Sequence, residues 1–69
     1  MAVNYQYNYA EIDPATGMCI GVYTSTFTSD NPNYIEIPVN DSNYLLKYYI
    51  NGSWYEDAAG TIPWESSLI

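Results

Sequence analysis

Residues 44–57 read YLLKYYI-NG-SWYED, and this stretch decides the fold. The pair Asn51-Gly52 favours a two-residue type I′ turn, because both central residues of that turn need a positive φ. Aromatic and β-branched residues, which favour strands, flank the pair on both sides. The turn predicts these cross-strand pairs: Ile50 with Ser53, Tyr49 with Trp54, Tyr48 with Tyr55, and Lys47 with Glu56. Such pairs contribute about 0.2–1 kcal/mol each, so we expect a hairpin with arms at 44–50 and 53–57.

The sequence before this hairpin alternates in the manner of strands and is divided by turn signals. Strands are expected at residues 5–12, 18–27 and 34–39. Residues 13–17 read DPATG and predict the turn between the first two strands, because Asp opens turns, Pro fixes φ and Gly accepts a positive φ. Loops are expected at 29–33 and 40–43. Pro38, which lacks an amide hydrogen, marks an edge or the end of its strand.

We therefore expect an all-β fold in a small single antiparallel sheet, a β-meander of about four or five strands built from hairpins. One face of these strands supplies the expected core, which consists of Ile12, Ile20, Val22, Ile35, Ile37 and Val39. The β domain covers residues 1–57, and an extended C-terminal tail covers 58–69. This tail carries Ile62 and Trp64, and three alternatives remain open for it. It docks both residues on the sheet, stays loose, or binds another chain.

Composition limits the classes of partner. The 69 residues form one small domain at most, with a hydrophobic fraction of 48% and an aromatic fraction of 17% that favour folding over disorder. Eight acidic residues stand against a single Lys, which gives a net charge of −7. Such a charge repels phosphate, so we expect no direct nucleic-acid partner and no binding to anionic membranes. Residues 1–5 do not resemble a signal peptide, and no apolar run is long enough to span a membrane.

Catalytic and metal-binding residue types are scarce. The chain has no His and no Arg, which excludes a Ser-His-Asp triad, a Cys/His zinc site and a bidentate phosphate clamp. Cys19 has no neighbouring base to activate it, and we interpret it as a small, partly buried strand residue. Glu11 and Asp13 share a strand face without a marked pocket, and the Asn/Asp loops at 30–33 and 40–43 lack the spacing of an EF-hand. We therefore expect no enzyme activity, no cofactor and no metal.

Aromatic side chains are the one surplus of the sequence, since nine Tyr and two Trp exceed what a core of this size can bury. Some of them must fill the core. The rest are expected to form a partner-binding face, because Tyr and Trp supply apolar area together with a polar group. The candidate partner-binding residues are Tyr5, Tyr7, Tyr9, Tyr48, Tyr49, Trp54, Tyr55 and Trp64. The two aromatic pairs of the last hairpin occupy opposite faces, so one is expected in the core and the other in an interface.

Three motifs carry a resemblance to a protein family. Residues 9–13 and 17–22 read YAEID and GMCIGV, residues 35–38 read IEIP, and the last hairpin contains LLKY at 45–48 and NGSWYE at 51–56. In this order and spacing the chain resembles small phage and prophage proteins of Gram-positive bacteria. Its closing hairpin resembles modules that end many phage tail and baseplate appendage proteins. The resemblance implies a phage setting and a virion- or tail-associated role, and it brings no catalytic residues.

Three functions remain as alternatives. The first is a non-enzymatic protein–protein interaction module of a phage, located in the virion or the host cytoplasm. Its partner would be a phage structural protein or a host protein, and self-association stays open. The second is an acidic inhibitor of a host defence protein, anti-CRISPR-like or a DNA mimic, which the net charge of −7 would suit. The third is a glycan-binding module that stacks sugars on Tyr or Trp rings.

Overall fold

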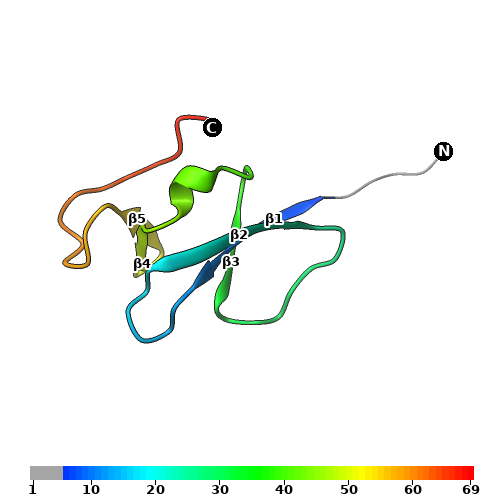
Figure 1. Cartoon of the computed structure of the whole chain (residues 1–69), viewed down its shortest axis with the longest axis horizontal. Coiled ribbons are helices and arrows are strands. Elements are labelled where there is room, and N and C mark those ends of the chain that lie inside the picture. Colours follow the sequence, from blue (N-terminus) through cyan, green and yellow to red (C-terminus); the bar gives the residue numbers. More distant parts are fainter. Residues whose placement is uncertain (1–5) are drawn as a thin grey trace.

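The computed structural model describes residues 6–69 and contains five strands and one short 3₁₀ helix (Figure 1). In chain order these are β1 (Tyr7–Ile12), β2 (Cys19–Ser25), β3 (Tyr34–Ile37), η1 (Ser42–Tyr44), β4 (Tyr48–Ile50) and β5 (Ser53–Tyr55). The named strands all pair antiparallel, so the predicted all-β antiparallel fold is confirmed. The start of the first strand at Tyr5 lies outside the described residues. Within residues 6–69, no helix is long and apolar enough to cross a membrane.

β1 is the central strand of a three-stranded sheet with the order β2-β1-β3. The predicted turn between β1 and β2 is present. Gly17 N donates to Asp13 O at 2.6 Å, Asp13 N donates to Met18 O at 2.8 Å, and Gly17 has a φ of 78°. The connection 26–33 then returns the chain, and β3 pairs with the other edge of β1. The strand order therefore differs from a simple meander, since β3 pairs with β1 rather than with its sequence neighbour β2. β3 ends directly before Pro38, as expected of a residue without an amide hydrogen.

β4 and β5 form a two-stranded sheet of their own, where a single sheet was expected for the whole chain. The type I′ turn is confirmed, because φ is 51° at Asn51 and 85° at Gly52. The register is also as predicted, with Ile50 opposite Ser53, Tyr49 opposite Trp54 and Tyr48 opposite Tyr55. Local turn chemistry therefore fixes this hairpin.

The further predicted pair, Lys47 with Glu56, is not part of the ladder, which ends at Tyr48 and Tyr55. The backbone groups of both residues bond to other segments. Lys47 O accepts a hydrogen bond from Cys19 N at 2.7 Å, and Glu56 N donates to Ile62 O at 2.8 Å. These bonds attach the ends of both arms to other parts of the chain.

The segment before β4 is a helical turn rather than the predicted strand. Asp41 caps η1, and its Oδ1 accepts a hydrogen bond from Asn43 N at 2.9 Å. Tyr44, which was expected to begin a strand, is the last residue of η1 and is buried. A turn at Leu45 and Leu46 follows, so the strand begins only at Tyr48.

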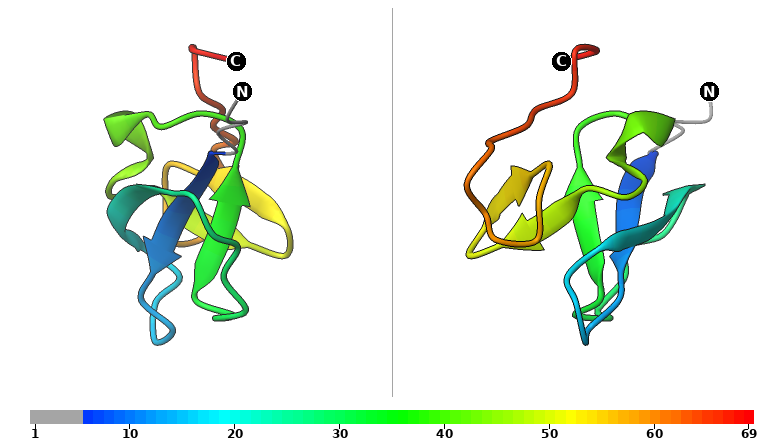
Figure 2. Two further views of the ribbon diagram at one scale, coloured as in Figure 1. Left: turned by 90° about the vertical axis from the view of Figure 1, so that its right-hand side faces the viewer. Right: turned by 60° about the vertical axis from the view of Figure 1, so that its left-hand side comes forward.

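Cys19 joins the two sheets. On one side it pairs with Ile12 of β1. On the other side Cys19 N donates to Lys47 O at 2.7 Å, and Cys19 O accepts from Leu46 N at 3.0 Å. A bridge between Met18 and Tyr48 continues this contact. The hairpin of β4 and β5 therefore lies beside the three-stranded sheet, as the right-hand view in Figure 2 shows.

A β-bulge in β2 decides which side chains face the core. Glu11 pairs with Gly21, whereas the next residue of β1, Ile12, pairs with Cys19, so Ile20 is an extra residue in β2. The extra residue interrupts the alternation along the strand. Cys19 is therefore turned into the core and is fully buried, while Ile20 is 50% exposed. The placement of Ile20 in the predicted core was wrong for this reason.

The core on the inner face of the three-stranded sheet consists of Ala10, Cys19, Ile37 and Tyr44, with Val22, Val39, Trp54 and Trp64 packed against it. The burial of Ile37, at 3% exposure, confirms its predicted role. Ile12 and Ile35 are only half-buried. Aromatic rings from η1, β5 and the C-terminal segment fill the space that the sequence pattern assigned to aliphatic side chains of the strands.

The C-terminal segment docks on the second sheet and on η1. Trp64 N donates to Trp54 O at 3.0 Å, and Pro63 forms a bridge with Tyr55. Ser66 is buried, and its Oγ donates to Asp41 Oδ2 at 2.5 Å. Figure 1 shows this segment running from β5 back towards η1. Of the alternatives for the tail, docking through Trp64 is therefore present, whereas Ile62 remains 51% exposed.

Candidate binding surfaces

The two Trp residues pack against one buried tyrosine instead of forming an open face. The ring centroid of Tyr44 lies 5.1 Å from that of Trp54 and 4.8 Å from that of Trp64, both in edge-to-face geometry. The ring centroid of Tyr49 lies 5.0 Å from that of Trp54. Lys47 Nζ lies 5.0 Å from the centroid of Trp64, in a cation–π contact. Most of the area of these rings therefore contributes to the interior of the protein.

The remaining tyrosines that the sequence predicted as binding residues are half-buried or buried. Tyr48 and Tyr55 are half-buried and face each other across β4 and β5, on the side of the hairpin opposite to Trp54. Tyr7 is half-buried, and Tyr5 lies outside the described residues. Tyr9 is only 5% exposed, and its Oη accepts a hydrogen bond from Ser29 N at 2.9 Å, so the loop after β2 covers its ring.

A turn at Leu45 and Leu46 presents apolar side chains to solvent. Leu45 has φ −56° and ψ 134°, Leu46 has φ 70°, and Lys47 N donates to Tyr44 O at 3.0 Å. These values define a type II turn with Leu46 at the position that usually holds Gly. The side chain of Leu46 is 66% exposed and that of Leu45 is 40% exposed.

The positive φ of Leu46 also fits its position opposite Cys19. Leu46 and Lys47 together lie opposite Cys19, which makes Leu46 the first residue of a bulge of the kind that normally has Gly there. A positive φ is unfavourable for a bulky residue, because Cβ approaches the backbone carbonyl. We name the exposed side chains of Ile20, Leu45 and Leu46 the leucine-turn surface. Ile20 belongs to it because it follows Cys19, whose carbonyl accepts the hydrogen bond from Leu46 N.

The outer face of the three-stranded sheet carries tyrosines and glutamates from all three strands. The rings of Tyr23 on β2 and Tyr34 on β3 stack with centroids 6.0 Å apart and an interplanar angle of 28°. Glu11 lies opposite Tyr34 in the pairing of β1 with β3, and Glu36 lies opposite Tyr9. Tyr23 Oη donates to Glu11 Oε1 at 3.0 Å. We name the side chains of Glu11, Tyr23, Tyr34 and Glu36 the Tyr–Glu face.

Sequence reasoning missed both surfaces, although the Tyr–Glu face left a signal. The alternation of strands places Glu11 on the same face as Tyr9, and it likewise places Glu36 with Tyr34. The leucine turn left no such signal, because no Gly stands between the end of η1 and the start of β4 to mark a turn. Nothing local to Leu46 indicates that its backbone must take a positive φ.

The candidate chemical groups have structural partners. Burial raises the pKa of the Cys19 thiol, whose Sγ donates to Gly21 O at 3.3 Å. Asp13 Oδ1 accepts from Ala15 N at 2.9 Å, and Asn31 Oδ1 accepts from Asn33 N at 2.9 Å, so these oxygens serve their own turns. In the part of the chain that the structure describes, there is no pocket and no cluster of three or more His, Cys, Asp or Glu side chains placed to hold a metal ion.

No protein-family model, curated protein or solved structure matches this chain. The fold and the two surfaces define a small antiparallel β protein that presents an apolar turn and a Tyr–Glu sheet face. Arguments about its function therefore start from these two surfaces.

Proposed function

We propose that the chain is a non-enzymatic protein–protein interaction module of a phage, associated with the virion or tail, and that it contacts its partner through the leucine-turn surface. The resemblance to phage proteins supports the phage setting. The observation that carries the proposal is Leu46, a bulky apolar residue that is 66% exposed and held at a φ of 70°.

Leu46 combines two unfavourable features that burial in the protein itself does not offset. A left-handed backbone at a bulky residue costs of order 1–3 kcal/mol, and Gly would remove this strain. Exposure of the side chain leaves its apolar area in water. Strained residues cluster at functional sites, where the strained geometry serves a contact. A partner that covers Leu46 together with Leu45 and Ile20 gives this arrangement a use.

The leucine-turn surface fits an apolar partner site better than a charged one. Its three side chains carry no polar atoms. Burial of apolar area is not screened by salt, so binding through this surface depends little on ionic strength. The effect of removing an apolar side chain from this surface should therefore be the same at low and high salt, whereas an inhibitor that binds through its charges should be insensitive to that change.

The inhibitor remains the second candidate because of the Tyr–Glu face. Glu11 and Glu36 lie on the same sheet face as the phenol groups of Tyr23 and Tyr34. Several acidic or polar oxygens on one face resemble the phosphates that a basic groove binds. Binding of that kind weakens steeply as salt rises, because it depends on exposed charges.

The test compares two exposed leucines. The full chain is used to recover a partner from phage particles and from lysates of infected cells, and the purified partner is then titrated with variants. Leu46→Gly keeps the turn and removes the side chain, so we expect about tenfold weaker binding or more. Leu68→Gly removes a side chain that is 61% exposed at another place and should leave the affinity unchanged. Equal affinities of the two variants, or a loss from Leu46→Gly that disappears at high salt, would contradict the proposal.

A further inference from the structure

We propose that the Tyr–Glu face binds an arginine-bearing segment of a partner protein. The inference rests on the proposed function, to which it adds the partner's chemistry and a second contact surface. In outline, the guanidinium group stacks on the ring of Tyr23 and pairs with the carboxylates of Glu11 and Glu36.

The stack of Tyr23 on Tyr34 is fixed by the sheet beneath it. Gly21 leaves room for the ring of Tyr23, since a Cβ at this position would lie 2.5 Å from Tyr23 Oη. The hydrogen bond from Tyr23 Oη to Glu11 Oε1, at 3.0 Å, holds the far end of the ring. Contact with Tyr34 supports one side of the ring, and the side chain of Tyr23 remains 46% exposed. A ligand therefore meets an aromatic platform that loses little rotamer freedom on binding.

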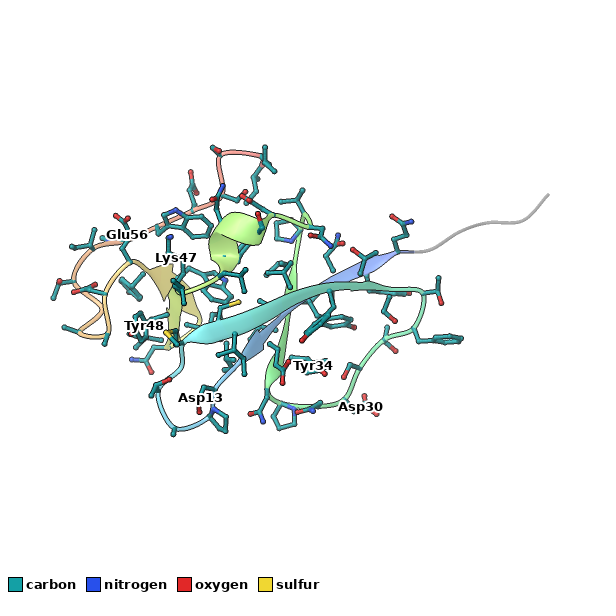
Figure 3. All side chains as sticks on the ribbon, viewed as in Figure 1. Asp13, Asp30, Tyr34, Lys47, Tyr48 and Glu56 are labelled. Carbon is teal, nitrogen blue, oxygen red and sulfur yellow. The ribbon has the colours of Figure 1, made fainter. Side chains whose placement is uncertain are left out.

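The charges beside the platform select a cation. Glu36 is exposed and Glu11 is half-buried, and both project from the face that carries the rings. The net charge of −7 adds a long-range attraction for a basic segment. The single lysine is engaged elsewhere, because Lys47 Nζ lies over the ring of Trp64. Figure 3 shows Lys47 near the second sheet, well away from Tyr34.

Arginine fits this face better than lysine. Its planar guanidinium stacks on an aromatic ring and at the same time offers several N–H donors to a carboxylate. It is also more weakly hydrated than an ammonium group, so its desolvation is less unfavourable. The flat aromatic platform provides a partner for the stacking, and the two carboxylates beside it provide partners for the N–H donors.

The arginine must come from another protein. The chain contains no Arg, so a second copy cannot supply the guanidinium group. Phosphate-bearing partners are repelled by Glu11 and Glu36. A basic protein segment remains as the macromolecule whose chemistry complements this face.

The backbone on either side of Ile20 connects to both surfaces. Its neighbour Gly21 pairs with Glu11 of the Tyr–Glu face, and its neighbour Cys19 accepts the hydrogen bond from Leu46 N. A single partner can therefore cover the leucine turn with an apolar site and reach the Tyr–Glu face with a neighbouring arginine.

The experiment titrates the ¹⁵N-labelled full chain with a short peptide of alternating Gly and Arg, followed by NMR. We expect shifts of the amides of β1, β2 and β3 and of the Tyr23 ring. The same peptide with Lys in place of Arg should bind more weakly, and the peptide with citrulline should not bind. Tyr23→Ala should weaken binding of the Arg peptide about two- to fivefold, while Tyr23→Phe, which keeps the ring, should retain most of it.

The matched charge variants are Glu36→Gln and Glu65→Gln, which each remove one exposed carboxylate. The first should weaken binding and the second should change it little. Equal binding of the Arg and Lys peptides, equal effects of the two Gln variants, or binding of a neutral oligosaccharide to this face without the Arg peptide would each overturn the inference. The purified partner distinguishes the two proposals. If Leu46→Gly weakens its binding and Tyr23→Ala does not, the interaction module stands and the arginine site fails.

Discussion

Tyr23 Oη donates a hydrogen bond to Glu11 Oε1 at 3.0 Å, with its ring lying over Gly21. This bond, followed by the negative charge of Glu11, raises the pKa of the Tyr23 phenol above its usual value. Deprotonation would remove the donated hydrogen and place a phenolate beside a carboxylate. The geometry of the Tyr–Glu face can therefore be followed through the titration of one tyrosine.

Gly21→Ala should lower the pKa of Tyr23 towards its usual value. The added Cβ would lie 2.5 Å from Tyr23 Oη, and the ring must move away from the sheet and from Glu11. The measurement is a pH titration of ¹³C-labelled tyrosine followed by NMR. Glu11→Gln is the comparison, because it removes the charge without filling the space over Gly21. A pKa of Tyr23 that is unchanged in both variants would show that the hydrogen bond does not form in solution.

Ile37→Ala should destabilise the protein by about 2–5 kcal/mol, because it leaves a cavity in the core. Ile20→Ala should change the free energy of unfolding by less than about 0.5 kcal/mol, since this side chain is 50% exposed. Denaturant unfolding of both variants measures the difference. The sequence pattern alone places both residues in the core, so similar losses for the two variants would mean that β2 lacks the bulge at Ile20.

Leu46→Gly should stabilise the protein by about 1 kcal/mol, because Gly accepts a positive φ without strain. Leu45→Gly is the matched control. Leu45 has a φ of −56°, so Gly there relieves no strain, and the added freedom of the unfolded chain should destabilise the protein. Thermal unfolding of the two variants should thus shift in opposite directions. A loss of stability in both would indicate that Leu46 packs against the protein.

Asp41 should make the protein sensitive to acid. The hydrogen bond from Ser66 Oγ, followed by the bond from Asn43 N, lowers the pKa of the Asp41 carboxyl in the folded state. Its contribution to stability is therefore complete above the ordinary Asp pKa and is lost as the pH falls through the lowered value. In Ser66→Ala the pKa of Asp41 should rise, and melting temperatures measured against pH should show a smaller acid-dependent decrease. Parallel pH profiles of the two proteins would contradict this.

The elements that could be predicted from the sequence are those with local turn chemistry. Asn51-Gly52 and the DPATG turn at 13–17 determine two hairpins, because their residues accept the required φ values on their own. The bulge at Ile20 could not be predicted in the same way. It depends on the pairing of Cys19 with residues of a different hairpin, and the alternation of side chains along 18–27 continues through it without interruption.

The candidate binding surfaces also depend on contacts between residues that are distant in the sequence. A surplus of aromatic residues is visible in the sequence, but their division between interior and surface follows from long-range contacts. Tyr44 is buried because Trp54 and Trp64 pack against it, and Trp64 belongs to the C-terminal segment, 20 residues away in the sequence. The strain at Leu46 arises from a bulge opposite Cys19, which no neighbouring residue in the sequence reveals.

The position of Cys19 gives the protein an internal reporter of cooperativity. Its thiol is fully buried, and it is the only thiol in the chain. Its backbone bonds belong to both sheets, so a reagent reaches the sulfur only when the contact between them opens. The rate of alkylation under native conditions then measures the free energy of that opening. If this free energy equals that of global unfolding, the chain opens as one unit. If it is smaller, the last hairpin detaches first.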